Sequence, residues 1–564
     1  MKNVKKIKAK RNLKIQGQKG ITLLVLVVTI IVLLILAGIT IGALTGENGI
    51  IKNTKESKEQ TEIANEKEIL EKATVEAMGK NKYGNIEESE LQNALNQETG
   101  DGKTEAVDVG EEFEVLFKES NRYYTVDKDG NVGEMQEYVE DKYPGDITVG
   151  ENGEKLDGDT EKTAYQICCI EDLVAFSNMV NGEGVILENG QATKINSPNT
   201  FYGKYVVLKT DLNFKSKLSY MDSERTDFGD INGNDNDGNT LMNEMTTGTG
   251  FKPIGDYTTT KNNSSFYGIF NGNEKKIKNI YINNNGYAGL FGRNVINNGG
   301  SNMIKNIEVT GDIKGKIAGG IIASTYSYTS ENSCQVINCI NRANIIGDEI
   351  AGGIIGEKTS SDGNFIIADC VNLAEISSDT VATGGIIGMA YNNTKIYNCY
   401  NTGKIFRQNT QENGYTGLGG IVGVAMYGNN IINSYNLGDV ENKGSVGNTG
   451  GIVGYKGWAE TYLENCYNTG NLSGRVVGGI IGSCNISNEL LITQNCFYLN
   501  NDISKGIGSG LKEDSEDIKG VSENEIKSVG ILELLNNYVE KNSLKDNINL
   551  KKWKLEDNGY STFE

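Results

Sequence analysis

Short apolar strings recur along residues 160–500, and each string is bounded by Gly, Asn or Asp. Strings of this length are too short for helices and are typical of β-strands. Gly and Asn at the boundaries favour tight turns, because both accept backbone conformations that other residues avoid. The pattern therefore predicts an all-β array of short strands.

Two markers repeat in phase along this region. Variants of Gly-Gly-Ile-Ile-Gly return seven times at steps of 28 to 35 residues, with the second glycine at Gly289, Gly320, Gly353, Gly385, Gly420, Gly451 and Gly479. An Asn or Asp followed by Cys or Ser keeps the same phase, at Cys339, Cys370, Cys399, Ser434, Cys466 and Cys496. Two markers in phase imply one structural unit per period. The sequence therefore predicts a β-solenoid with repeats of about 31 residues, whose coils stack at the β spacing of about 4.8 Å.

Three columns of side chains follow from stacking these repeats. The Cys positions, with Ser434 as a near-isostere, are expected to point inward, where a free thiol packs as a small hydrophobe. An Asn column is expected two residues later, with amides that hydrogen-bond from coil to coil, at Asn341, Asn372, Asn401, Asn436 and Asn468. Tyr400, Tyr435 and Tyr467 form a third column, which either stacks on itself or grips sugars.

The N-terminus carries an export signal. Residues 1–20 hold seven Lys and one Arg without an acid, and residues 21–44 contain no charged side chain. A stretch of that length can span a bilayer as a helix, and the basic flank favours an orientation that places the rest of the chain outside. A plain signal-anchor explains these features as well as a cleaved leader does.

The junction from Gln18 to Val25 resembles the type IV prepilin motif. That resemblance implies cleavage after Gly20 by the prepilin peptidase and methylation of Ile21, with 1–20 as the leader and 21–44 as the transmembrane helix. Val25 stands where pilins carry a glutamate, which favours a minor or tip subunit, or a chain that stays anchored. Other pilins are then possible partners beside the membrane.

Residues 45–145 are expected to continue outward from the membrane. Residues 45–100 predict a helical stalk, with Ile63, Leu70, Ala73 and Ala77 on one narrow face. Residues 101–145 predict a small β head and linker, and together these segments form an α+β head. Asp127, Asp129 and Asn131 resemble part of a calcium loop, but a turn around Asp129-Gly130 is favoured.

The strings Cys399-Tyr400-Asn401-Thr402-Gly403 and Cys466-Tyr467-Asn468-Thr469-Gly470 resemble GLUG-type repeats of bacterial surface proteins. Similar matches run from a strand and helix at residues 165–182 to Trp553, with a C-terminal cap expected over 501–564. The resemblance implies a right-handed β-helix at the cell surface. Some proteins with these repeats are immunoglobulin-cleaving metalloproteases, but this chain has no histidine with which to build their His-Glu-x-x-His zinc helix.

Composition narrows the possible functions. The formal net charge is −20 and the histidine count is zero, which argues against nucleic-acid binding, zinc catalysis and His-dependent triads. Nine cysteines, mostly inside the repeats, do not form the pattern of a disulfide-stapled domain.

Three functional classes remain. The favoured class is a membrane-anchored, extracellular adhesin or interaction rod with an unidentified surface glycan or protein as ligand, and recognition is expected in loops such as 426–430 and 455–460. The alternatives are a minor or tip pilin or pseudopilin, and a β-helical polysaccharide-degrading enzyme. For the enzyme, the candidate acids are Asp227, Asp230, Asp235 and Asp237, which read better as a solvated loop. We predict no catalytic residue, metal or cofactor, and we predict that the chain is not an enzyme.

Overall fold

The computed structural model describes residues 50–564, apart from 81–85, 111, 121, 134, 138–144, 151–152, 189–190, 222–238, 257–263, 297–300, 328–332, 360–362, 408–415, 445, 486–489, 502 and 511–515. The predicted leader, the processing residues Gly20 and Ile21, the span over 21–44 and the acidic cluster at 227–237 lie outside the described residues. Among the residues that are described, no helix is long and apolar enough to cross a membrane. The chain divides into two units, residues 1–135 and 136–564.

The first unit is a small α+β fold. Two helices, α2 (Ile50–Lys80) and α3 (Glu88–Thr99), accompany an antiparallel sheet of β1 (Thr104–Asp108), β2 (Glu112–Phe117) and β3 (Arg122–Asp127). The two-residue strand β4 (Gln136–Glu137), which begins just after the boundary between the units, pairs with β3. Leu70, Ala73 and Ala77 of α2 are fully buried in the core of this unit, as their spacing predicts. Glu66 of α2 accepts a hydrogen bond from Tyr124 Oη at 2.7 Å, which ties the helix to β3.

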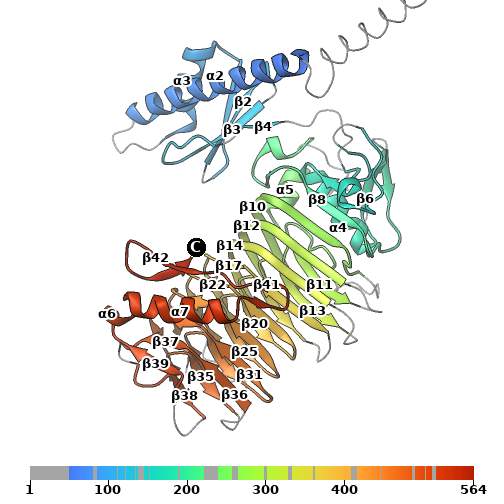
Figure 1. Cartoon of the computed structure of the whole chain (residues 1–564). Coiled ribbons are helices and arrows are strands. Elements are labelled where there is room, and N and C mark those ends of the chain that lie inside the picture. Colours follow the sequence, from blue (N-terminus) through green and yellow to red (C-terminus); the bar gives the residue numbers. More distant parts are fainter. Residues whose placement is uncertain are drawn as a thin grey trace, which may run out of the picture. The chain divides into compact units, whose positions relative to one another are not determined.

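The second unit is a β-solenoid, and the sequence prediction of this fold is confirmed. The first coils are formed by long strands that pair in parallel: β10 (Ile269–Ala288), β12 (Ser301–Gly319) and β14 (Ser333–Gly352). Each of these strands runs along several sides of a coil, and register shifts in the β10–β12 pairing mark three of the bends. Figure 1 shows the successive coils stacked from β10 to the C-terminal end of the solenoid.

Later coils divide into separate short strands, which stack into five parallel ladders. The first ladder contains β16 (Asn364–Ala368), β21 (Thr394–Tyr397), β26 (Asn429–Ile432), β31 (Thr461–Glu464) and β36 (Leu491–Gln494). The second contains β17 (Val371–Asn372), β22 (Tyr400–Asn401), β27 (Tyr435–Asn436), β32 (Tyr467–Asn468), β37 (Cys496–Leu499) and β39 (Ile518–Val521). The third contains β18 (Ile376–Ser378), β23 (Ile405–Arg407), β28 (Val440–Asn442) and β33 (Leu472–Ser473).

The fourth and fifth ladders complete each coil. The fourth contains β19 (Ala382–Gly384), β24 (Gly417–Gly419), β29 (Asn448–Gly450) and β34 (Val476–Gly478). The fifth runs through the whole described solenoid as β11 (Phe291–Ile296), β13 (Ile322–Ser327), β15 (Ile355–Lys358), β20 (Ile387–Ala390), β25 (Val422–Ala425), β30 (Val453–Lys456), β35 (Ile481–Cys484) and β38 (Ile507–Ser509).

The repeated glycines are required by close approach inside the coil. A Cβ on Gly420 would lie 2.3 Å from Cγ of Asn436 and 2.2 Å from the carbonyl oxygen of Gly451. The equivalent glycines Gly353, Gly385 and Gly451 meet the amide side chains of the Asn column in the same way. Glycine is therefore the residue that leaves room for that column.

A helix covers the N-terminal end of the solenoid core. It is α4 (Ile170–Asn181), whose residues Leu173, Phe176 and Val180 are fully buried in the same core as the coils. The surrounding elements are η1 (Glu161–Thr163), β5 (Tyr165–Ile167), β6 (Val185–Glu188), β7 (Gln191–Lys194), β8 (Tyr205–Leu208), β9 (Leu212–Asn213), η2 (Lys217–Ser219) and α5 (Leu241–Thr246). β5, β8 and β9 pair into the first coil.

The C-terminal segment, for which the sequence predicts a cap over 501–564, contains residues that lie along the side of the coils. Residues up to β39 complete the last coil, and the chain then turns back through α6 (Glu523–Ile526), α7 (Val529–Lys541), β40 (Leu544–Lys545), β41 (Ile548–Asn549), β42 (Trp553–Leu555) and β43 (Ser561–Phe563). Figure 1 shows α6 and α7 beside the stacked strands. We call the solenoid surface under residues 523–564 the flank. It shares an apolar cluster with the segment, because outward-facing Tyr and Ile side chains of the coils pack against α7 and Trp553.

Candidate functional site

The Cys column lies in the solenoid interior. Cys339, Cys370, Cys399, Cys466 and Cys496 are all 0% exposed and carry free thiols, and Ser434 occupies the same column. Ser434 Oγ accepts a hydrogen bond from the Cys399 backbone nitrogen at 3.1 Å and donates to the Ile432 carbonyl at 3.1 Å. Burial raises the pKa of the Cys399 thiol well above its usual value, which suppresses the reactive thiolate.

The Asn column predicted beside it forms a continuous inner ladder. Each Nδ2 donates to the Oδ1 of the next coil, at 2.8 Å from Asn341 to Asn372, 2.6 Å from Asn372 to Asn401, and 2.7 Å both from Asn401 to Asn436 and from Asn436 to Asn468. The same amides donate to the carbonyl two residues ahead, such as that of Gly403. These contacts satisfy buried polar groups and close a turn in every coil.

A second, outer ladder is formed by the residue that precedes each Cys or Ser. These residues have a positive φ between 52° and 57°, at Asn338, Asp369, Asn398, Asn433, Asn465 and Asn495. Asn306, which precedes Ile307 in the same column, extends the ladder by one coil with a φ of 58°. Asn favours this left-handed conformation more than most residues, which explains its recurrence at the corner. Here the Nδ2 of each Asn donates to the preceding coil, for example from Asn433 to Asn398 at 2.7 Å. Asp369 has no amide and only accepts, from Asn398 Nδ2 at 3.0 Å. The two ladders therefore run in opposite directions.

The outer ladder also holds the C-terminal segment. Asn398 Nδ2 donates to the Asn549 carbonyl at 2.9 Å, and Asn433 Nδ2 donates to the Lys551 carbonyl at 3.0 Å. In return, the indole nitrogen of Trp553 donates to Asn433 Oδ1 at 2.7 Å. The sequence marked these Asn positions as periodic, but it gave no sign of the partner that they hold.

The tyrosine column stacks and is covered. The rings of Tyr400 and Tyr435 are 4.8 Å apart and 2° from parallel, and those of Tyr435 and Tyr467 are 5.3 Å apart at 11°. Trp553 packs over the column at 5.3 Å from Tyr435 and 5.5 Å from Tyr467. Tyr435 and Tyr467 are 2% and 1% exposed, so they are not available to grip a sugar.

A different aromatic row is exposed at the turn after the fifth ladder. Tyr391, Tyr427 and Trp458 follow β20, β25 and β30 in three successive coils, and we call them the loop-edge row. Ring centroids are 5.5 Å apart between Tyr391 and Tyr427 and 5.9 Å apart between Tyr427 and Trp458, with the rings tilted by 42° and 37°. Tyr427 and Trp458 are each 37% exposed. Tyr427 and Trp458 lie within the predicted recognition loops 426–430 and 455–460, whereas Tyr391 lies outside them and was not identified from the sequence.

Two buried lysines hold the backbone of this edge. Lys456 is 0% exposed, and its Nζ donates to the carbonyls of Gly457 at 3.1 Å, Trp458 at 3.2 Å and Ala459 at 2.5 Å. Burial lowers the pKa of Lys456 to about 8. Lys358, in the same column of the fifth ladder, donates to the Asn392 carbonyl. Fixing the turn in this way fixes the direction in which the aromatic rings point.

An apolar cluster lies beneath the row. Ile350, Val424, Met426 and Tyr455 are buried in it, and Tyr391 packs against it. The predicted loop ranges therefore included supporting residues, because Met426 and Tyr455 belong to this cluster. Glu357, one ladder position before Met389 of the same cluster, accepts a hydrogen bond from Ser324 Oγ at 3.0 Å, and burial raises its pKa to about 7.

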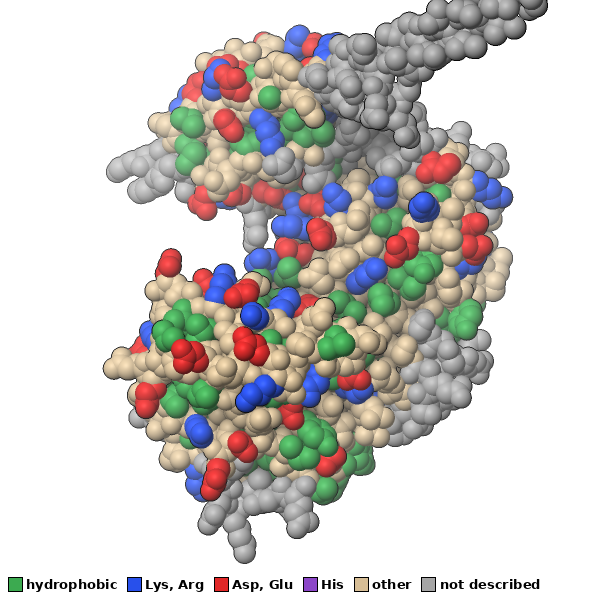
Figure 2. Space-filling view, in the orientation of Figure 1, with side chains coloured by type: hydrophobic (Ala, Val, Ile, Leu, Met, Phe, Trp, Pro, Cys, Tyr) green, Lys and Arg blue, Asp and Glu red, His purple; other side chains and the backbone are tan. Residues whose placement is uncertain are grey.

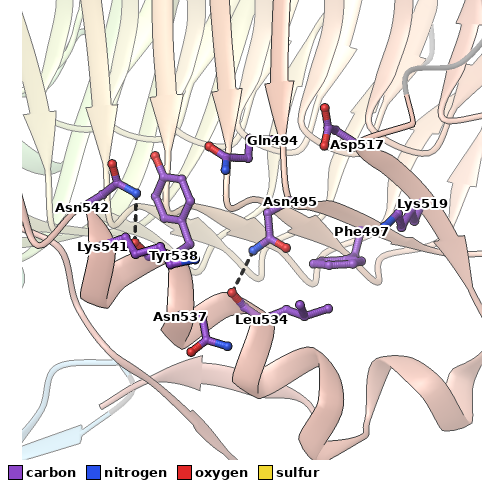
Figure 3. Close-up of a pocket in the computed structure, with 10 residues that line it drawn as sticks. All are labelled: Gln494, Asn495, Phe497, Asp517, Lys519, Leu534, Asn537, Tyr538, Lys541 and Asn542. Carbon is purple, nitrogen blue, oxygen red and sulfur yellow. Dashed lines mark hydrogen bonds between the residues drawn. The ribbon is translucent and has the colours of Figure 1, made fainter.

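Other candidate sites offer less. A pocket of about 270 Å³ is lined by Asn495, Leu534 and Tyr538 among others, and Figure 3 shows Asn495 donating to the Leu534 carbonyl. This pocket is the seam between α7 and the last coil, so it belongs to the docking of the C-terminal segment. Asp127 accepts hydrogen bonds from the backbone nitrogens of Asp129 and Asn131, as in a turn. Within the described ranges, no group of His, Cys, Asp and Glu could hold a metal ion.

Similarity to known proteins is limited. No protein-family model matches the chain, and no curated protein matches it. One crystal structure is similar. It is that of a putative immunoglobulin A1 protease from Bacteroides ovatus, with 18% identity and a TM-score of 0.40, covering 73% of this chain and 95% of that chain.

The name of that protein contradicts our prediction that this chain is not an enzyme, and we withdraw the prediction. At this identity and TM-score, the likeness is too distant to carry an argument about what this chain does. The resemblance to GLUG repeats stays a prediction, since no family model matches.

Proposed function

We propose that this protein is an exported β-solenoid rod that acts at the cell surface as an adhesin or interaction rod. The observation that carries the proposal is the loop-edge row, in which Tyr427 and Trp458 are 37% exposed while the other aromatic column of the same coils is covered. Tyr and Trp are enriched where proteins bind partners, because they offer a large contact area with a polar edge. The buried lysines beneath the row support a preorganised surface.

The proposed location rests on the N-terminal sequence. Five residues separate the apolar stretch 21–44 from α2, which begins at Ile50, so a helix anchored in the membrane would lead into the first unit. The similarity of residues 18–25 to a prepilin junction supports processing between Gly20 and Ile21 by a prepilin peptidase. The resemblance of the repeats to GLUG proteins supports a place outside the cell.

Binding is tested by replacing the exposed turns and keeping their supports. Residues 427–428 and 458–460 are changed to Gly and Ser, while Met426, Tyr455 and Lys456 are left in place because they are buried. Cells that display the variant should lose attachment to host or bacterial surfaces, while the far-UV circular dichroism of the purified variant is unchanged. Attachment that survives the replacement would contradict the proposal.

Export is tested by mass spectrometry of the mature N-terminus. The prepilin proposal requires a methylated Ile21, and Gly20→Leu should leave the leader attached because the peptidase needs an unshielded backbone at that position. An intact Met1 in the natural chain would instead show a plain signal-anchor.

A minor or tip pilin is the second candidate. It is favoured by the first unit, in which the 31-residue helix α2 packs its Leu70, Ala73 and Ala77 face on an antiparallel sheet. The measurement is the presence of the chain in filaments sheared from cells. Recovery with other pilins would support this candidate, and recovery in membranes alone would favour the anchored rod.

A further inference from the structure

We infer that the loop-edge row is a binding site for a neutral polysaccharide that lies along the axis of the solenoid. This inference rests on the proposed function and names its ligand class. Three properties of the row favour such a ligand: the spacing of the rings, their exposed area and the polar groups beside them.

The row offers one aromatic ring per coil. The ring centroids are 5.5 and 5.9 Å apart, so three rings follow one another along the stacking direction of the coils. The face of an aromatic ring carries partial negative charge. A sugar ring presents C–H groups of slightly positive charge on its apolar face, and a chain of sugar rings presents such faces at regular intervals. A regular row of rings therefore suits a linear polymer.

The exposed aromatic area is small. At 37% exposure, Tyr427 and Trp458 each leave on the order of 100 Å² in contact with solvent. A stable protein interface buries roughly 800 Å² on each partner, several times what the row presents. An area of this size matches the faces of a few sugar rings. The row alone is thus better fitted to a glycan than to a folded protein.

The polar groups around the row are mostly uncharged. Asn392, Asn393 and Asn430 lie in the same turns or just after them, and the carboxylate of Glu460 accepts a hydrogen bond from Tyr462 Oη at 2.9 Å. Amide and hydroxyl groups are the natural partners of sugar hydroxyls. The chain carries a net charge of −20, which repels polyanionic glycans. Figure 2 shows positive and negative side chains interspersed on the visible face, with no large field of one sign there. These charges favour a neutral ligand.

The first experiment is affinity gel electrophoresis of the full-length chain in detergent. The gels contain galactomannan, arabinoxylan, yeast mannan or hydroxyethyl cellulose, with polygalacturonate and hyaluronate as polyanions. At least one neutral polymer should retard the chain, and Tyr427→Ala or Trp458→Ala should weaken its apparent affinity about tenfold. Tyr202→Ala is the matched control, because Tyr202 is 61% exposed but lies outside the row.

Three results would overturn the inference. They are no retardation by any neutral polymer, retardation that both row variants preserve, and equal retardation by the polyanions. If attachment to cells still depends on residues 427–428 and 458–460 while no glycan binds, the proposed binding function stands and the ligand class is wrong. If neither attachment nor glycan binding depends on those residues, both proposals fail.

The second experiment uses the two tryptophans of the chain as probes. Trp458 is 37% exposed and Trp553 is 1% exposed, so a ligand on the row changes the emission and acrylamide quenching of Trp458 alone. The change should saturate with the same neutral polymer that retards the chain. Trp458→Phe, which keeps an aromatic ring, should abolish the fluorescence change and keep part of the retardation. A change that persists in Trp458→Phe would place the ligand elsewhere.

Discussion

Two aromatic rows cross the same three coils and serve different purposes. On the flank, Tyr400, Tyr435 and Tyr467 stack within 2° and 11° of parallel beneath the C-terminal segment. At the loop edge, Tyr391, Tyr427 and Trp458 are tilted by 42° and 37°, and two of the three are exposed. Both rows repeat with the coil, so periodicity does not distinguish a packing column from a binding surface. The two rows are distinguished by whether another segment covers them. On the flank, the C-terminal segment covers the tyrosine rings, and its residues lie about a hundred positions later in the chain.

The first prediction concerns the buried Cys column, whose disruption should disturb both aromatic rows because the same coils carry them. Cys399→Arg places an unpaired charge in a fully buried column and should destabilise the solenoid by about 3–5 kcal/mol. Cys399→Ser should cost less than about 1 kcal/mol, because Ser434 already occupies the same column. Urea unfolding of the two variants measures the difference, and equal stability would show that the column does not face the core.

The second prediction separates the rows by their tryptophans. Trp553→Ala should cost about 3–5 kcal/mol, because it removes a fully buried ring from over Tyr435 and Tyr467. Limited proteolysis should then release the C-terminal segment first. Trp458→Ala is the matched control at the loop edge and should change the free energy of unfolding by no more than about 0.5 kcal/mol. A large cost at Trp458 would mean that the loop-edge row is structural.

The third prediction concerns the amide that links the flank to its cover. Asn433→Gly keeps the backbone at a φ of 53° accessible, but it removes the bonds to the Lys551 carbonyl and to Trp553. It also removes the outer-ladder bonds to Asn398 and from Asn465. We expect a loss of about 1–3 kcal/mol in thermal or chemical unfolding. Asn433→Ala should lose a further 1 kcal/mol or so, because alanine resists positive φ. Identical losses for Gly and Ala would show that the conformation contributes nothing.

The fourth prediction tests the support of the loop edge through pH. The pKa of Lys456 is lowered to about 8 in the folded chain, from an ordinary value of 10.5. Above pH 8 the unfolded chain keeps a proton that the folded chain has released, so folding stability rises with pH, by at most about 1.4 kcal/mol per unit. The difference in unfolding free energy between the natural chain and Lys456→Met, followed from pH 7 to 9.5, isolates this contribution. A flat difference would mean that Lys456 titrates normally.

The sequence predicted the solenoid because its interior is repetitive. Cys, Asn and Gly positions recur in phase, and each residue type meets a local requirement of the coil. Cys supplies a small buried side chain, Asn forms an amide bridge to the next coil, and Gly leaves room for that amide. The helix that covers the N-terminal end, α4, also coincides with the expected strand and helix at 165–182. These features depend on contacts within one coil or between adjacent coils, so they leave a periodic pattern from which the sequence predicts them.

What the sequence could not reveal depends on contacts between distant segments. The expected cap over 501–564 includes residues that pack along the flank, since Trp553 finds its partners at Asn433 and Tyr435, more than a hundred residues earlier. Recognition was expected in the loops at 426–430 and 455–460, but Met426, Tyr455 and Lys456 within these ranges are buried and support the turns. Tyr391 is the first residue after its strand, whereas Tyr427 and Trp458 are each the second, so the row has no strict period in the sequence.

The course of the C-terminal segment has a mechanical consequence. Its carbonyls accept from Asn398, Asn433 and Asn465, which lie in the same coils as Tyr391, Tyr427 and Trp458 respectively. A tensile load on the loop-edge row therefore acts on coils that the C-terminal segment links on their other side. These links are the hydrogen bonds from the three Asn side chains to the carbonyls of the segment. Peeling one of these coils from its neighbour requires rupture of both the ladder and these links. The coils that bear the loop-edge row are therefore among those that the C-terminal segment reinforces against shear.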